Sequence, residues 1–182
     1  MIICGRDLNN DLKYAVVDDL LEPPLLGRVK ELFDTPPDGY KKSTKHWKNP
    51  LCEYKVDGKS YKVNDCLISP IYNDNEVINE YNDILLSHIS SESSFQVFDT
   101  HMYRWTPGSC IMWHDDPGWD INFTFYVSDW NKNWGGELML DDNTWIYPKA
   151  NRLFMAVNIW HKTNLIAPNC PERLTLQTFI KL

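Results

Sequence analysis

The C-terminal half of the chain carries a series of short stretches in which apolar and polar residues alternate, separated by turn-forming residues. Alternation with a period of two is typical of a strand that buries one face. Regularly spaced strands of this kind favour a β-sandwich or a β-barrel. The predicted strands cover residues 95–105, 111–116, 120–127, 137–140, 144–147, 152–161 and 174–180.

Residues 1–94 are predicted to add a short strand and two helices to this β-rich region. Pro23-Pro24 is typical of the first turn of a helix, and apolar residues at helical spacing follow it, which predicts a helix that packs under a sheet. Asn73 and Glu76 have the spacing of a capping box. They predict the start of a second helix, whose apolar stripe continues to residue 89.

A hairpin is predicted over residues 52–63, because Asp57-Gly58 separates two alternating runs and this dipeptide favours the tight turn between paired strands. The surrounding segment, residues 41–62, is locally basic. One interpretation is a solvated surface hairpin whose lysines keep the chain soluble. The lysines of this segment are Lys41, Lys42, Lys45, Lys48, Lys55, Lys59 and Lys62.

Length and composition predict one globular domain over residues 1–182, since a hydrophobic content of 43% can fill a core. The net charge of −7 disfavours a nucleic-acid or an anionic-membrane partner. Five scattered cysteines without a Cys-x-x-Cys motif indicate free thiols in a reducing compartment. With no signal-peptide pattern and no apolar run of about 20 residues, we expect a soluble, cytoplasmic protein.

A His-x-Asp motif and a later single histidine are the residues of the β region best suited to bind a metal. In an extended strand, residues two apart point to the same face, so His114 and Asp116 project together and Asp115 points away. His161 arrives from another predicted strand. Two imidazoles and one carboxylate suit non-haem Fe(II) and leave coordination positions open. The alternative is two unrelated buried histidines.

The order of motifs around these residues resembles the 2-oxoglutarate/Fe(II)-dependent dioxygenases, and within them the prolyl 4-hydroxylase-like branch. The resemblance covers residues 95–182 and implies a double-stranded β-helix (jelly roll) core, with the N-terminal helices packed on one sheet. It is carried by Tyr103, the motif His114-x-Asp116, the strand 121–126, Gly135-Gly136-Glu137-Leu138, Pro148, Asn151-Arg152-Leu153-Phe154, His161 and Arg173.

The resemblance also implies a set of cofactors and roles. The cofactors are Fe(II), held by the triad, 2-oxoglutarate as cosubstrate, O₂, and ascorbate as reductant. Arg173 is expected to anchor the distal carboxylate of 2-oxoglutarate, because a guanidinium matches a carboxylate with two parallel hydrogen bonds. Thr175 and Tyr126 are expected to contact the same carboxylate, Tyr103 to line the pocket, and Leu138 to wall it. The alternative for Arg173 is a structural ion pair with an acid.

By the same resemblance, the enzyme would hydroxylate an unactivated C–H bond, with a prolyl residue in a peptide or protein as the leading substrate. Another side chain, a free amino acid or a small metabolite is the first alternative. A non-catalytic, cupin-like binding barrel is the alternative of a different class. The hairpin 52–63 is expected to act as a lid, and the basic segment 41–62 favours an extended, acidic polymer as substrate.

Two residues beside the motifs have weaker predictions. Arg152 is expected to reach the site, since relatives often carry a basic or small residue in that stretch. Trp160 is expected to point away from His161, because it precedes it in a strand, and to lie in the core.

Overall fold

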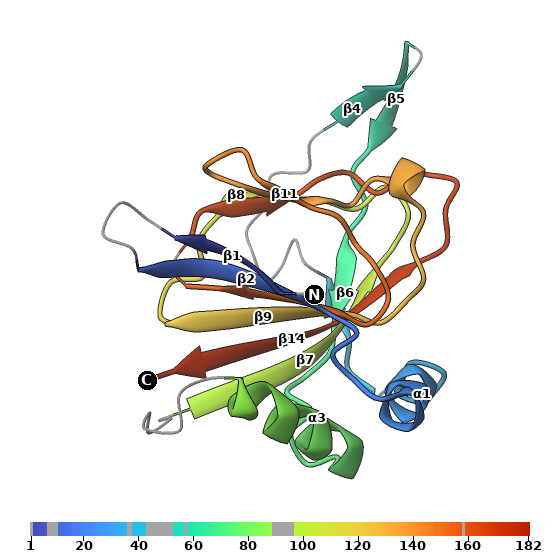
Figure 1. Cartoon of the computed structure of the whole chain (residues 1–182). Helices are drawn as coiled ribbons and strands as arrows, with labels where there is room; N and C mark the ends of the chain where they lie inside the picture. Colours follow the sequence, from blue (N-terminus) through green and yellow to red (C-terminus); the bar gives the residue numbers. More distant parts are fainter. Residues whose placement is uncertain are drawn as a thin grey trace.

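The computed structural model of the chain describes residues 2–6, 11–35, 38–42, 53–56, 58–88, 97–157 and 159–182. Two antiparallel sheets lie one above the other, and both helices lie below the larger sheet (Figure 1). The fold is mainly β, as the sequence predicts. The four cysteines in this part of the chain form no disulfide with one another, and Cys52 lies outside it.

The larger sheet has eight strands, and every neighbouring pair in it is antiparallel. It combines the N-terminal strands with the long strands of the predicted β region. In sheet order the strands are β1 (Ile2–Arg6), β2 (Leu12–Asp18), β12 (Arg152–Ala156), β9 (Ile121–Tyr126), β14 (Arg173–Lys181), β7 (Val97–Trp105), β6 (Cys66–Ile68) and β3 (Lys41–Lys42).

The smaller sheet has four strands and carries both histidines of the predicted triad. The prediction of one strand over 152–161 is wrong, because the chain leaves the larger sheet after β12 and enters the smaller sheet at β13. Alternation continues across this change of sheet, so the pattern alone does not reveal it. In sheet order the strands are β11 (Trp145–Ile146), β10 (Leu138–Leu140), β13 (His161–Thr163) and β8 (Ile111–His114).

The two helices, α1 (Pro23–Leu32) and α3 (Glu76–Ser87), bury their apolar stripes against the outer face of the larger sheet. A one-turn 3₁₀ helix, η1 (Lys132–Trp134), follows β9. None of the described helices is long and apolar enough to cross a bilayer. The core on this side consists of Leu25, Val29, Ile78, Tyr81 and Leu85 from the helices, with Phe123, Phe125, Leu153 and Leu176 from the sheet among their partners.

The predicted capping box of α3 is wrong by two residues. Asn75 is the N-cap, and its side-chain oxygen accepts hydrogen bonds from the amides of Val77 and Ile78. The Asn73 side chain instead accepts a hydrogen bond of 3.0 Å from the amide of Thr100 in β7. Asparagine is a favoured N-cap residue, and both Asn73 and Asn75 lie just before the helix. The sequence alone therefore does not show which of them is the N-cap.

The predicted hairpin is confirmed in its backbone pairing. Strand β4 (Glu53–Val56) pairs with β5 (Lys59–Lys62) as a separate two-stranded sheet (Figure 1). Gly58 has a φ of +75°, the left-handed conformation that a two-residue hairpin turn requires. Asp57 and residues 43–52 lie outside the described residues. The role of this hairpin as a lid stays a prediction.

Arg152 does not reach the triad, contrary to the prediction. It lies directly opposite Asp18 in the pairing of β12 with β2, and its guanidinium forms two hydrogen bonds, of 2.6 and 3.0 Å, with that carboxylate. The ammonium of Lys149 lies 3.2 Å from the same carboxylate. The hydrogen bond from Arg152 is the main cause that lowers the pKa of Asp18 below its ordinary value of 3.8.

We predict that Asp18→Asn lowers the free energy of unfolding by about 1 kcal/mol at pH 7, the usual size for a hydrogen bond to a charged group that is mostly buried. Because folding lowers the pKa of Asp18, its contribution is fully present above pH 3.8 and is lost as the pH falls below that value. Urea unfolding of both proteins at pH 7 and at pH 3 measures this difference.

Asp19→Asn is the matched control, since the Asp19 side chain is 77% exposed and touches only Lys149. It should change stability by less than Asp18→Asn. A loss for Asp18→Asn that is equal at both pH values would contradict the assignment to the charged pair.

Candidate metal and cosubstrate site

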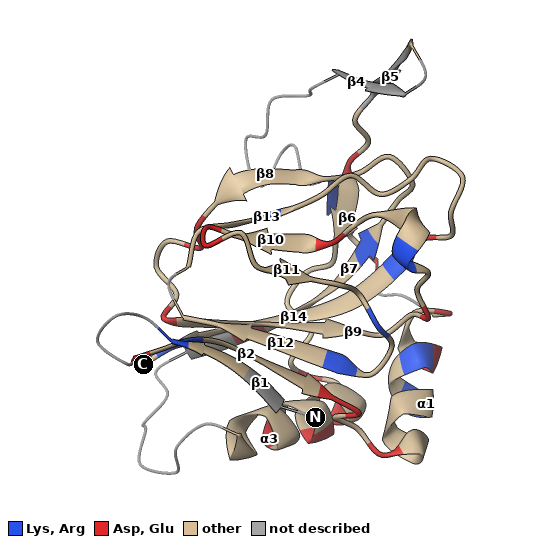
Figure 2. Ribbon diagram, turned by 45° about the horizontal axis from the view of Figure 1, so that its top comes forward, with Lys and Arg blue, Asp and Glu red and all other residues tan. Residues whose placement is uncertain are grey.

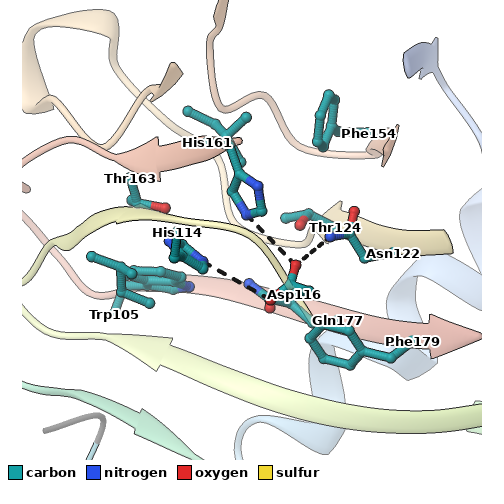
Figure 3. A pocket seen from close by; sticks show the side chains of 12 residues that line it. Trp105, His114, Asp116, Asn122, Thr124, Phe154, His161, Thr163, Gln177 and Phe179 are labelled. Carbon is teal, nitrogen blue, oxygen red and sulfur yellow. Dashed lines mark hydrogen bonds and ion pairs between the residues drawn. The ribbon is translucent and has the colours of Figure 1, made fainter. Parts of the chain in front are cut away.

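The three residues of the predicted triad meet between the two sheets. His114 lies directly opposite His161 in the pairing of β8 with β13, and their ring centroids are 4.3 Å apart. The Nε2 atoms of His114 and His161 lie 4.0 and 3.7 Å from the two carboxylate oxygens of Asp116 (Figure 3). One ligand atom from each residue therefore lies within 4.8 Å of the others.

Backbone contacts fix how both histidines present their nitrogens. Nδ1 of His114 lies 2.7 Å from the carbonyl oxygen of Met112, and Nδ1 of His161 lies 2.9 Å from that of Ile159. A carbonyl oxygen only accepts hydrogen bonds, so Nδ1 carries the proton and donates it. The lone pair of each Nε2 then points toward Asp116. This is the arrangement in which an outer hydrogen bond orients a metal-binding imidazole.

The electrostatics of the site keep His114 in the neutral form that binds metals. Burial is the largest cause that lowers its pKa, and the neighbouring His161 lowers it further, while Asp116 acts in the opposite direction. A metal ligand must have a free lone pair, so a lowered pKa means that less proton release accompanies metal binding at neutral pH.

Asp116 reaches the triad from the segment that follows β8, which ends at His114. Figure 2 shows acidic residues in the segment that directly follows β8. Asn122 of β9 donates a side-chain hydrogen bond to Oδ2 of Asp116 (Figure 3). Asp115 is not among the ligand atoms that meet here, and it lines an outer cleft together with His114 and Asp116. The larger sheet thus holds the carboxylate while the smaller sheet holds both imidazoles.

The donor set fits a divalent metal. Two imidazole nitrogens and one carboxylate oxygen, with His161 only 7% exposed, would hold Fe(II) and leave further coordination positions open. Within the described part of the chain, this is the one group of three or more histidine, cysteine or acidic side chains at metal-binding distance.

A small inner cavity lies at the triad, between the two sheets. Its wall combines side chains from both sheets, and Leu138 lies on it as predicted. The residues on the wall besides the triad are Trp105, Ile111, Asn122, Thr124, Leu138, Phe154, Thr163, Gln177 and Phe179 (Figure 3).

Trp105 and Thr163 are among the wall residues that the sequence analysis did not name, although the strand period could have indicated them. Trp105 lies two residues after Tyr103 on β7, and Thr163 lies two residues after His161 on β13, so each shares a face with a residue that was named. Trp105 also lies opposite Arg173 in the pairing of β7 with β14.

Arg173 is buried beside this cavity without an acidic partner among the described residues. It is 2% exposed, its Nη1 donates to the carbonyl oxygen of Gly136, and its Nε has no hydrogen-bond partner. Burial lowers its pKa to about 10. The alternative of a structural ion pair therefore finds no support, and a buried guanidinium of this kind fits an anionic ligand.

Arg173 lies behind aromatic rings rather than on the wall of the cavity. Its guanidinium carbon is 4.3 Å from the ring centroid of Trp105 and 5.6 Å from that of Tyr126. The Trp105 indole donates a hydrogen bond of 3.0 Å to the hydroxyl of Thr175. Arg173 therefore lies beside the rings of Trp105 and Tyr126, and Thr175 is linked to this cluster by its hydrogen bond with Trp105. Contact of Thr175 and Tyr126 with a cosubstrate carboxylate stays a prediction.

Gly135 and Gly136 allow the chain to pass close to this cluster. Both have φ near +70°, at 69° and 73°. A Cβ on Gly135 would lie 2.1 Å from the carbonyl oxygen of Leu165, and a Cβ on Gly136 would lie 3.0 Å from Nη1 of Arg173. Both positions therefore require glycine, just before the strand β10 that begins at Leu138.

The second hollow, the outer cleft, opens beside the triad and is much wider than the inner cavity. Tyr103 lies here and not on the wall of the inner cavity. The outer cleft is lined by Ile71, Asp99, His101, Tyr103, Asp115, Pro117, Trp119 and Phe179, together with His114 and Asp116 of the triad.

Comparisons with solved structures find the same fold in oxygenases of low sequence identity. A prolyl-4-hydroxylase from Pseudomonas putida matches with a TM-score of 0.69 and 16% identity, over 93% of this chain and 92% of that chain. A prolyl hydroxylase from Trichoplax adhaerens, in complex with a hypoxia inducible factor oxygen degradation domain peptide fragment, matches with a TM-score of 0.68 and 13% identity, over 92% and 83%. HygX from Streptomyces hygroscopicus, with nickel and 2-oxoglutarate bound, has a TM-score of 0.65 and 8% identity, over 92% and 82%.

The amino-acid sequence matches a family model over part of its length. A search of curated proteins found no match. The sequence model of the 2OG-Fe(II) oxygenase superfamily matches residues 98–181, the range that contains the triad and Arg173. The resemblance found in the motifs is thus confirmed. Over residues 98–181, which carry the site, the chain therefore resembles the 2OG-Fe(II) oxygenase superfamily in sequence as well as in motif order.

Proposed function

We propose that this protein is a 2-oxoglutarate- and Fe(II)-dependent dioxygenase that hydroxylates an unactivated C–H bond, most favourably of a prolyl residue in a peptide or protein. The observation that carries the proposal is the pairing of a His-Asp-His triad with a buried arginine that has no acidic partner among the described residues. Solved prolyl hydroxylases of the same fold, one with a peptide bound, support the prolyl substrate.

In this proposal His114, Asp116 and His161 hold the metal, and Arg173 binds the distal carboxylate of 2-oxoglutarate. With both bound, Fe(II) would supply the activation of O₂ for hydroxylation of the substrate, 2-oxoglutarate would be oxidised to succinate and CO₂, and ascorbate would serve as the external reductant. We further propose a double-stranded β-helix core within a single domain over residues 1–182, supported by the two facing antiparallel sheets.

The chain's own residues prepare the site for this chemistry. Asn122 orients the Asp116 carboxylate by donating a hydrogen bond to Oδ2, the oxygen that lies 3.7 Å from Nε2 of His161. The Tyr126 ring lies 5.6 Å from the guanidinium carbon, Thr175 is linked to the same cluster through the Trp105 indole, and Leu138 contributes an apolar side chain to the cavity wall. For a carboxylate to reach Arg173, the Trp105 ring has to shift, since it lies on the cavity wall in front of the guanidinium.

The same chemistry on another side chain, a free amino acid or a small metabolite is the first alternative, and HygX, a solved structure of the same fold, has nickel and 2-oxoglutarate bound. A binding barrel without catalysis is the alternative of another class. It gives no reason for a buried cation to lie without an acid beside a metal-binding triad.

We predict that Asp116→Asn abolishes Mn(II) binding, whereas Asp115→Asn keeps it, because only the first carboxylate faces the two Nε2 atoms. His114→Ala and His161→Ala should behave like Asp116→Asn and should also abolish turnover. Manganese content after anaerobic dialysis provides the measurement. Equal metal content in Asp115→Asn and Asp116→Asn would contradict the ligand assignment.

We predict that Arg173→Met abolishes stabilisation by 2-oxoglutarate while the metal still binds, and that its melting temperature without ligands is at least that of the wild type. The buried charge loses only the Gly136 hydrogen bond and ring contacts, and removing an uncompensated buried charge is favourable. Thermal shift with Mn(II), with and without 2-oxoglutarate, reads out both effects. Arg173→Lys is the control that keeps the charge, and it should retain part of the response.

The function itself is tested by succinate release from 2-oxoglutarate with Fe(II) and ascorbate, and by a gain of 16 daltons on proline-containing peptides. A dioxygenase releases succinate, and a prolyl hydroxylase also adds the mass to proline. A binding barrel releases none under any condition. Succinate release with no mass gain on any prolyl peptide would leave the reaction class standing and reject the prolyl substrate.

A further inference from the structure

The outer cleft beside the triad is lined by two carboxylates that are not part of the triad. Asp99 and Asp115 both line it, and neither has a hydrogen bond or an ion pair with another described residue. The described lining contains no lysine or arginine. The exposed Lys41 lines a neighbouring hollow, which shares Ile71 and His101 with the outer cleft.

Aromatic rings form the floor between these two carboxylates. The ring of Phe179 lies 5.8 Å from that of Trp119 and 6.3 Å from that of His101, and His101 lies 6.4 Å from Tyr103. The faces of aromatic rings attract cations, and the attraction grows where the cation is partly desolvated. A floor of rings with carboxylates at its edge is therefore suited to an ammonium or a guanidinium group.

A largely buried tyrosine also lines this cleft. Tyr103 is 1% exposed, lines the outer cleft, and has no hydrogen-bond partner among the described residues. Burial raises the pKa of Tyr103 well above its ordinary value, so the hydroxyl stays protonated and can donate a hydrogen bond.

The register of the larger sheet gives the distance between this charge and the metal. Phe179 of β14 lies opposite Asn122 on one side and opposite Asp99 on the other, and Asn122 holds the metal-binding carboxylate. Two strand spacings therefore separate Asp99 from Asn122, about 10 Å. A cation at Asp99 would thus lie several carbon atoms away from the C–H bond that faces the metal.

We propose that the outer cleft is the substrate subsite and that it selects a substrate carrying a cationic amine or guanidinium group, held by Asp99 and Asp115 over the aromatic floor of Phe179 and Trp119. This inference rests on the proposed function and narrows its substrate class. It opposes the expectation of an acidic substrate drawn from the basic segment 41–62, because the cleft beside the triad has the opposite charge.

The test uses the full-length protein loaded with Mn(II) and 2-oxoglutarate under anaerobic conditions, with calorimetric titration of four probes. Three are acetylated and amidated pentapeptides with a central proline flanked by lysine, by Nε-acetyl-lysine or by glutamate. The fourth is free lysine. The lysine peptide or free lysine should bind about five- to tenfold more tightly than the acetyl-lysine peptide, since two partly exposed charge pairs each contribute about two- to fivefold.

The variants Asp99→Asn and Asp115→Asn should each remove part of this preference, and the double variant should remove all of it, with Mn(II) affinity unchanged. Asp83→Asn is the matched control for net charge, because Asp83 is an exposed residue of α3 on the opposite face of the larger sheet. It should keep the full preference. The preference should also shrink as salt is raised from 50 to 500 mM.

Each outcome has one meaning. A preference confined to the lysine peptide assigns a peptide substrate, and one confined to free lysine assigns a small amine. If neither lysine probe binds more tightly than the acetyl-lysine peptide, or the preference survives in the double variant, the inference is overturned. Loss of the Mn(II)-dependent stabilisation by 2-oxoglutarate would instead mean that the proposed function has failed, independently of charge preference.

Discussion

The pairing of β8 with β13 is the interaction on which the site depends. It sets His114 opposite His161 in the smaller sheet, while the facing sheet supplies Asn122 to hold Asp116. The metal site is therefore shared between two sheets, and it exists only when they are stacked in one register. A shift of one residue in β13 would turn the His161 side chain to the outer face and leave Lys162 facing the cavity.

The larger sheet divides stability and chemistry between its two faces. Along β9, Ile121, Phe123 and Phe125 pack against the helices, whereas Asn122 and Thr124 face the cavity. The helix side supplies a continuous apolar core, so the cavity side can retain polar groups that contribute little to folding. The unsatisfied Nε of Arg173 is of this kind. Such groups are stable only because the opposite face of the same strands is well packed.

The sequence predicted the triad well, because the two-residue period and the order of motifs are local properties. It did not predict which strands lie side by side, and the errors follow from that. Arg152 pairs with Asp18 because β12 lies beside β2. Trp105 was missed because its position opposite Arg173 depends on the register of β7 and β14. Trp160 points away from His161 as expected, but it is 50% exposed, since the outer face of the smaller sheet has no covering layer among the described residues.

In the proposed arrangement, charge separates the two ligands of the enzyme. The cosubstrate 2-oxoglutarate is a dianion, and its favourable partners are the metal and the deeply buried Arg173. Asp99 and Asp115, at the outer cleft, repel that dianion and attract a cation. Because Coulomb interactions are strengthened where water is excluded, Arg173 dominates for the cosubstrate deep in the site although the mouth opposes it. A cationic substrate is instead attracted to Asp99 and Asp115 and repelled by Arg173. Each ligand is therefore disfavoured in the position of the other, so the site discriminates by repulsion as well as by attraction.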